Sequence, residues 1–183
     1  MQIIRTFVLS SLVVVLSACA SKAPEKAPEP PRASWADSRV ADVTTVAEAQ
    51  GFKVKREGEE IRVIIPVDGN FHPKRTLLLP RGLVPIGKVG AALKDDAECH
   101  FRVVGHSDSD GDEATNKKLA LERAQAVANM LMLSGVSRKR MSLEGLGEID
   151  PRADNSTPTG RELNRRVEII LTPALADTSL AKK

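Results

Sequence analysis

The run Val104-Gly-His-Ser-Asp108-Ser-Asp-Gly111 is followed, after four intervening residues, by Asn116-Lys-Lys-Leu-Ala-Leu-Glu-Arg123-Ala-Gln-Ala-Val127. The first run begins as the apolar end of a strand expected over 99–105 and then turns polar. The second belongs to a helix expected over 113–134, with apolar residues at helical spacing and Gly135 as its terminator. A strand that passes through a polar turn into a long helix is the local framework of this chain.

Two charged residues in this framework can meet. Asp108 lies just past the strand end, and Arg123 lies about three turns into the helix. Asn116, Arg123 and Val127 share one helix face, because residues three, four and seven apart are neighbours on a helix surface. A carboxylate and a guanidinium in one groove would suit a zwitterion, with Asp108 holding an ammonium group and Arg123 a carboxylate.

The flanking segments extend this unit into a two-layer fold. Leu79, Leu83, Ile86, Val89 and Leu93 recur at helical spacing, although Pro80 and Pro85 restrict the first turns. Further strands are expected over 141–145 and 166–171, with a short helical turn at 159–163 between them. The pattern predicts an α/β (α+β) sandwich, a mixed sheet whose helices pack on one face.

The chain before this domain divides into three parts. Residues 36–66 are expected to form a small helix-plus-hairpin extension, with a helix over 37–50 and strands at 52–56 and 61–65. Residues 19–35 are rich in Pro, Ala and charge, which is typical of an extended tether. Residues 1–18 read as a secretory signal, with a charged start and an apolar run too short to span a bilayer. The polar tail 174–183 is expected to be disordered.

The segment Leu16-Ser-Ala-Cys19 resembles the lipobox of bacterial lipoproteins. The resemblance implies cleavage after Ala18 and acylation of Cys19, by palmitate or similar chains, and these would hold the protein on a membrane. Ala20 follows the cysteine where many lipoproteins retained in the inner membrane carry Asp, which points to the outer membrane with the domain in the periplasm. Cys99 then has no disulfide partner and is interpreted as a buried small hydrophobe.

Several motifs together resemble the peptidoglycan-binding domain of the OmpA, Pal and MotB family. They are the strand–turn–helix segment above, Gly145-Leu-Gly-Glu-Ile-Asp-Pro151, Asn155-Ser-Thr157 and Gly160-Arg-Glu-Leu-Asn-Arg-Arg-Val-Glu-Ile169. The resemblance covers about residues 67–173. Val67-Asp-Gly-Asn-Phe71 departs from the Phe-Asp motif usual in the first strand of the family.

The resemblance implies non-covalent binding of the peptidoglycan stem peptide. The family's aspartate and helix arginine, which grip the two ends of the diaminopimelate side chain, fall on Asp108 and Arg123. The supporting positions fall on Asn116, Arg161 and Arg165, and on the loop that contains Asn70. The chain would then be an outer-membrane lipoprotein that tethers the membrane to the cell wall, and the alternative is a Pal-like scaffold whose partner docks on residues 36–66.

Other readings fit the residues less well. Asp108-Ser-Asp110-Gly-Asp112 lacks the glycine and the final glutamate of an EF-hand calcium loop. His106, Ser107 and Asp108 are adjacent at a strand end, so their side chains point apart and cannot form a hydrolase relay. We therefore expect no enzyme activity, cofactor or metal, with His106 as a packing or hydrogen-bonding residue and Arg166 as part of a structural ion-pair cluster. Slight net charge and sparse aromatic residues speak against nucleic acid.

Overall fold

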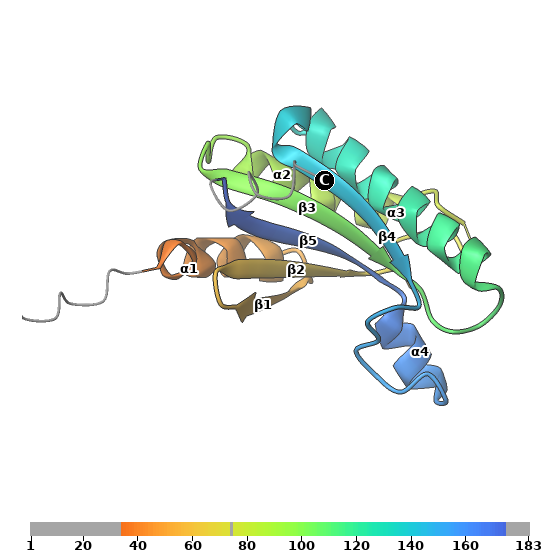
Figure 1. The fold of residues 1–183 in the computed structure, drawn as a ribbon. Coiled ribbons are helices and arrows are strands. Elements are labelled where there is room, and N and C mark those ends of the chain that lie inside the picture. The colour runs from red at the N-terminus through yellow and green to blue at the C-terminus, as the bar shows by residue number, and fades with distance from the viewer. Residues whose placement is uncertain (1–33, 74, 175–183) are drawn as a thin grey trace, which may run out of the picture. The chain divides into compact units, whose positions relative to one another are not determined.

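In a computed structural model, which describes residues 34–73 and 75–174, the chain alternates helices and strands (Figure 1). The sheet is formed by β1 (Lys53–Glu57), β2 (Glu60–Pro66), β3 (Cys99–His106), β4 (Met141–Gly147) and β5 (Arg166–Pro173). The helices are α1 (Trp35–Glu48), α2 (Pro80–Leu93), α3 (Glu113–Leu133) and α4 (Pro158–Asn164), with a 3₁₀ turn, η1, at Arg138–Arg140.

The strands make one mixed sheet in the order β1-β2-β5-β3-β4. β5 lies between β2 and β3 and is antiparallel to both, whereas β3 and β4 are parallel and are joined through α3. A parallel pair needs such a crossover, which places α3 against the sheet. The predicted α+β sandwich is confirmed.

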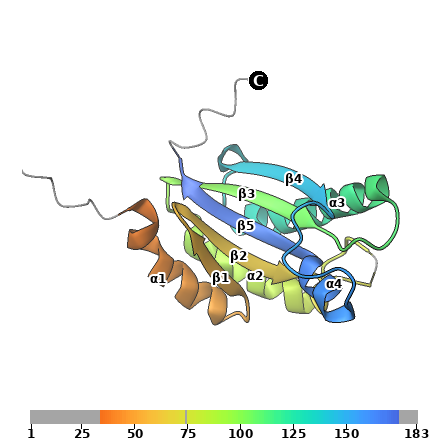
Figure 2. The ribbon, with the colours of Figure 1, turned by 60° about the horizontal axis from the view of Figure 1, so that its bottom comes forward.

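The hydrophobic core lies between the sheet and the layer formed by α1, α2 and α3 (Figure 2). Phe101 and Val103 of β3 alternate with residues on the other face, as the two-residue period of a strand requires. Ala124, Val127 and Leu131 form the buried stripe of α3, and the stripe expected from the sequence is confirmed. Cys99 is buried in this core, which raises the pKa of its thiol to about 12. Its interpretation as a small hydrophobe is confirmed.

Gly105 sets the distance between β3 and α3. A Cβ atom at this position would lie 1.9 Å from the carbonyl oxygen of Ala120, so only glycine allows the helix to rest on the strand. Directly after it, the pairing of β3 with β4 shifts register, with Gly105 opposite Gly145 but His106 opposite Gly147. The chain therefore leaves the sheet at Ser107 and Asp108, close beneath the first turns of α3.

The helix and hairpin at 36–66 are continuous with the domain. β2 pairs with β5 from Ile61 opposite Leu171 to Pro66 opposite Arg166, so β2 is an internal strand of the sheet. The sequence pattern predicts the hairpin of β1 and β2 but does not predict that β5 pairs with β2, because local periodicity carries no information on which distant strands pair. A boundary at residue 66 would thus separate two hydrogen-bonded strands.

The signal segment 1–18, Cys19, the tether up to residue 33 and the tail 175–183 lie outside the described residues. The description begins at Ser34, which caps α1 by accepting a hydrogen bond from the backbone N–H of Asp37. Among the helices of residues 34–73 and 75–174, none has the length and apolar character needed to cross a membrane.

Candidate functional site

A cleft of about 730 Å³ opens where β2 and β3 end and α3 begins. Its walls come from the loop after β2, the turn after β3, the first half of α3 and the residue before β5. The lining residues are Val67, Asp68, Gly69, Phe71, His72, Pro73, Ser107, Asp108, Asp110, Gly111, Thr115, Asn116, Leu119, Arg123 and Arg165.

Asp108 lies on the floor of the cleft, only 8% exposed, and is paired with Arg165. Nη1 of Arg165 donates a hydrogen bond of 2.6 Å to Oδ2 of Asp108. The same guanidinium donates through Nε and Nη2 to the carboxylate of Asp68, at 3.2 and 2.5 Å. Hydrogen bonding to Asp68, and then to Asp108, raises the pKa of Arg165, so this cation remains charged throughout the physiological range.

Arg123 is the buried cation of the cleft, with 3% of its surface exposed. Its Nε donates a 3.1 Å hydrogen bond to the backbone carbonyl of Arg75, and no carboxylate of the described residues lies within 4 Å of its guanidinium. Burial lowers the pKa of Arg123, while Asp68 and Asp108 act in the opposite direction from a greater distance. A buried guanidinium without an ion-pair partner is uncommon, because desolvation of a charge is costly unless an opposite charge compensates it.

Asn116 gives the turn after β3 its shape. Its Nδ2 lies 3.3 Å from the carbonyl oxygen of Asp108 and 3.1 Å from that of Asp110. Both contacts tie the turn to the first turn of α3, whose N-cap is Asp112. Asn116 therefore lines the cleft and also fixes the backbone on which Asp108 stands.

The structure places the other two predicted site residues away from the cleft wall. Asn70 turns back on its own loop, because its Nδ2 donates a 3.0 Å hydrogen bond to the carbonyl of Pro66. Arg161 does not line the cleft. Its Nε lies 3.3 Å from the carboxylate of Asp110, and its Nη1 donates a 2.9 Å hydrogen bond to the carbonyl of Asn155. The structure thus brings together Asp108, Arg123, Asn116 and Arg165, all predicted from the sequence.

Sequence analysis missed Asp68 as a functional candidate. Asp68 stands two residues before Asn70, in the loop that departs from the family pattern, and its carboxylate holds Arg165. The available signal was its place directly after a strand and beside a glycine, Gly69, whose φ is 82°. Which side chain of this loop faces the cleft depends on the turn geometry, which residue identity alone does not determine.

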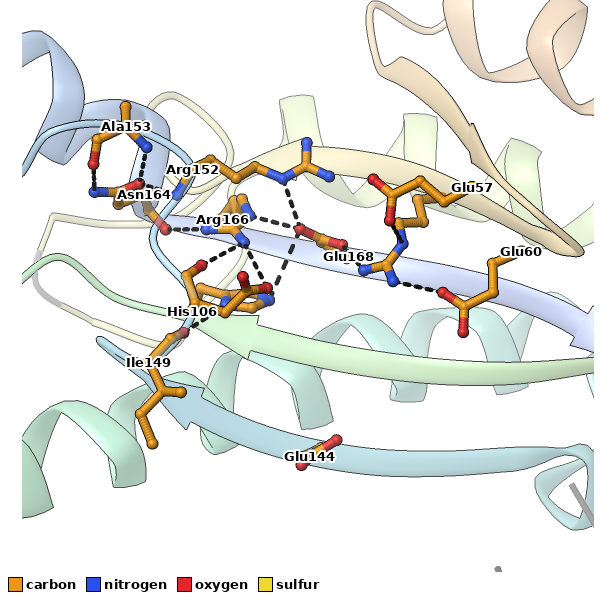
Figure 3. A network of polar contacts seen from close by, with 12 residues as sticks. Glu57, Glu60, His106, Glu144, Ile149, Arg152, Ala153, Asn164, Arg166 and Glu168 are labelled. Carbon is orange, nitrogen blue, oxygen red and sulfur yellow. Dashed lines mark hydrogen bonds and ion pairs between the residues drawn. The ribbon is translucent and has the colours of Figure 1, made fainter. Parts of the chain in front are cut away.

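A second polar network lies on the face of the sheet opposite α2 and α3 (Figure 3). Glu168 of β5 is fully buried, and its carboxylate accepts from Nε of Arg166 at 2.6 Å and lies 3.0 Å from Nε of Arg152. Nη1 of Arg62 donates to the other oxygen at 3.1 Å. The arginines hold the pKa of Glu168 below its usual value despite its burial. The expected structural role of Arg166 is confirmed.

His106 belongs to this network. Its ring is buried, with Nε2 3.8 Å from Glu168 and Nδ1 3.4 Å from the carbonyl of Ile149. Burial and the nearby Arg166 lower its pKa to about 4, so the ring is neutral at physiological pH. The expected packing or hydrogen-bonding role of His106 is confirmed. Among the described residues, no group of three or more His, Cys, Asp and Glu side chains is placed to hold a metal ion.

The fold and this cleft define a class of small α+β domain with a charged cleft at one end of its sheet, and the sequence matches the model of the OmpA family over residues 70–165. The chain belongs to the OmpA family. The match includes the turn after β3, the whole of α3 and Arg165, and therefore covers the residues that form most of the cleft.

Three curated relatives support this membership. The chain is 34% identical over 163 residues to the outer-membrane lipoprotein YfiB of Pseudomonas aeruginosa, covering 89% of each chain. It is 34% identical over 139 residues to the probable lipoprotein YiaD of Escherichia coli, covering 76% of this chain and 64% of YiaD. The peptidoglycan-binding protein ArfA of Mycobacterium tuberculosis is 36% identical over 94 residues, which are 51% of this chain and 29% of ArfA.

A solved structure shows the same fold. The cell wall anchor of the type VI secretion system (T6SS) of Pseudomonas aeruginosa superposes with a TM-score of 0.62 and 27% identity. The superposition covers 78% of this chain and 99% of that one. The family, the relatives and this structure therefore agree on an OmpA-like domain.

Proposed function

We propose that this protein is a lipoprotein of the outer membrane whose periplasmic domain binds peptidoglycan non-covalently, and so tethers the membrane to the cell wall. The ligand is the diaminopimelate residue of the stem peptide. The observation that carries the proposal is the buried guanidinium of Arg123, which lines the cleft without an ion-pair partner among the described residues. A carboxylate bound there would supply the missing opposite charge.

The other end of the cleft complements the amino group of the same ligand. Asp68, Asp108 and Arg165 together carry one net negative charge, and Arg165 uses one oxygen of Asp108. The ammonium of diaminopimelate would approach the remaining oxygen while its carboxylate reaches Arg123. Each charge-assisted contact contributes about 1.5 to 3 kcal/mol before binding entropy is subtracted, so single-site affinity is modest. The polymeric wall and the membrane anchor raise the effective concentration.

Two relatives support the wall as the target, since ArfA is named a peptidoglycan-binding protein and the secretion-system structure is named a cell wall anchor. The lipobox-like Leu16-Ser-Ala-Cys19 and the outer-membrane lipoprotein YfiB support the anchor. The proposal is one of binding without catalysis. Cys19→Ser should move the protein from the membrane fraction to the soluble fraction, and recovery with the membranes would contradict lipid anchoring.

The binding proposal is tested by sedimentation with purified sacculi. Wild type should sediment with sacculi that contain diaminopimelate and should be released by a free stem peptide that contains this residue. Asp108→Asn and Arg123→Gln should each lose at least about tenfold in affinity, which corresponds to one lost charge-assisted contact. Asp95→Asn, an exposed change outside the cleft, is the matched control. If both cleft variants sediment like wild type, the proposal fails, and equal binding to lysine-type sacculi would remove the diaminopimelate specificity.

A further inference from the structure

Strand β4 forms one free edge of the sheet and differs in sequence from β1 at the other edge (Figure 2). β1 reads Lys53-Val-Lys-Arg-Glu57 and is short and highly charged, which is how natural sheets shield an edge. β4 reads Met141-Ser-Leu-Glu-Gly-Leu-Gly147 and contains a single charge. Within the described chain, no backbone hydrogen bond from outside the sheet reaches residues 142–145. The β4 edge is therefore open to pairing.

An open groove of about 610 Å³ runs beside this edge, between β4 and α3. Its apolar part is formed by Leu121 of α3 and by Leu143 and Leu146 of β4. Leu121 faces the groove and is 44% exposed, whereas the opposite face of α3 is buried against the sheet. An exposed apolar strip beside an unpaired strand is a combination that bound peptides use.

Gly145 fixes the depth of this groove. A Cβ atom there would lie 2.6 Å from the Cβ of Leu121 and 2.7 Å from the carbonyl oxygen of Lys117. The helix thus rests directly on the strand at this point, and its outer flank borders the strand edge. The groove is built into the contact between two rigid elements and does not depend on a loop.

Basic side chains stand at both ends of the β4 edge. Lys117 and Lys118 line the groove near the end of β4, and Arg138 and Lys139 lie in the 3₁₀ turn that leads into its first residue, Met141. All four are exposed, and none has a carboxylate of the described residues within 4 Å. The single acid of the strand, Glu144, lies 3.7 Å from Arg102 of the neighbouring strand. The edge therefore presents unpaired positive charge around an apolar strip.

We propose that the β4 edge and its groove bind an extended acidic segment of a protein partner, which adds to the sheet as a further strand. Its backbone would pair with residues 142–145, and alternate apolar side chains would lie on Leu121, Leu143 and Leu146. Its carboxylates would meet Lys117 and Lys118 at one end and Arg138 and Lys139 at the other. This surface lies outside the cleft, so the inference does not depend on peptidoglycan binding.

The charges disfavour a second copy of this chain as the occupant. Antiparallel pairing of two β4 edges would place Lys117 and Lys118 of one copy opposite Arg138 and Lys139 of the other. Like charges across paired strands are destabilising. A segment that carries carboxylates removes this repulsion and matches the basic ends of the edge.

The test is a titration of the full ¹⁵N-labelled chain with two short synthetic peptides, one of alternating glutamate and valine and one of alternating lysine and valine. The acidic peptide should shift the backbone amide signals of residues 142–145, and the basic peptide should not. The double variant Lys117→Glu with Lys118→Glu should weaken the acidic peptide about tenfold, through lost and reversed charge contacts. Lys88→Glu, an exposed reversal on α2, should bind like wild type.

Two results would overturn the inference. The first is an acidic peptide that leaves the amides of residues 142–145 unchanged, or that binds no better than the basic peptide. The second is a shift of the same amides with protein concentration alone, which would identify a second copy as the occupant. If the double variant fails to fold by circular dichroism, Lys139→Glu on the 3₁₀ turn provides the same charge test.

Discussion

Arg165 binds Asp108 through one arm of its guanidinium and Asp68 through the other two, at 2.6 Å to Asp108 and at 2.5 and 3.2 Å to Asp68. The acidic end of the cleft thus already contains a cation, whereas the basic end, Arg123, has no anion among the described residues. This asymmetry means that the two ends of a zwitterionic ligand meet different conditions. The carboxylate finds an unpaired partner, and the ammonium must share Asp108 with Arg165.

Because Arg123 is buried without an ion-pair partner, we expect it to favour ligand binding while lowering the stability of the ligand-free protein. We expect Arg123→Met to raise the free energy of unfolding of the ligand-free protein by about 1 to 2 kcal/mol, because a desolvated charge is replaced by an apolar side chain of similar length. The same variant should lose sacculus binding. Urea denaturation measures the first effect, and a loss of stability greater than about 1 kcal/mol would show that Arg123 is compensated in the free protein.

Asp68 should control the affinity of the acidic end. In Asp68→Asn, Arg165 loses its second carboxylate and can close on Asp108, and the cleft also loses one negative charge. Both effects oppose an ammonium ligand, so affinity for the stem peptide should fall about fivefold, with little change in stability because the pair is partly exposed. Calorimetric titration checks this, with Asp95→Asn as the matched control. Tighter binding by Asp68→Asn would indicate that Arg165 assists the ligand instead of competing with it.

Glu168 should be the most sensitive charge in the domain. Its removal leaves three arginines without their shared carboxylate, and breaking a buried ion pair from one side costs about 3 to 5 kcal/mol. We therefore expect Glu168→Gln to reduce the free energy of unfolding by about that amount in urea. Glu144→Gln on the edge strand β4 removes an exposed acid and should change the free energy of unfolding by less than about 1 kcal/mol. Similar small effects for both variants would mean that the network contributes no net stability.

The depressed pKa of His106 predicts loss of stability in mild acid. The folded pKa of about 4 lies below the unfolded value near 6.5, so between these values the unfolded chain binds more protons. This contribution is fully present above about pH 6.5 and is lost progressively as the pH falls toward 4, by about 3 kcal/mol in total. Unfolding of wild type and His106→Gln between pH 7.5 and 5 should show a weaker pH dependence in the variant. Parallel curves would place the titration on another group.

Much of the fold and of the cleft could be predicted from local sequence patterns. The helical stripe of α3, the apolar run of β3 and the polar turn between them follow from hydrophobic periodicity and turn residues, so Asp108, Asn116 and Arg123 could be placed on neighbouring elements before the structure. Arg165 was predicted through the resemblance to the OmpA family. The place of β2 inside the sheet and the role of Asp68 could not be predicted, because both depend on contacts between segments about a hundred residues apart.

The sequence by itself determined the α+β class, the membership in the OmpA family and the presence of one carboxylate and one guanidinium at a common groove. These features depend on residue types at fixed local spacing, which hydrophobic periodicity and turn chemistry express directly. Only the tertiary structure decided that Asp108 is paired and Arg123 is not, that Asn70 turns away from the cleft, and that β4 is an open edge. Ion pairing and burial depend on which distant side chains share a low-dielectric environment, and the folded chain alone specifies that environment.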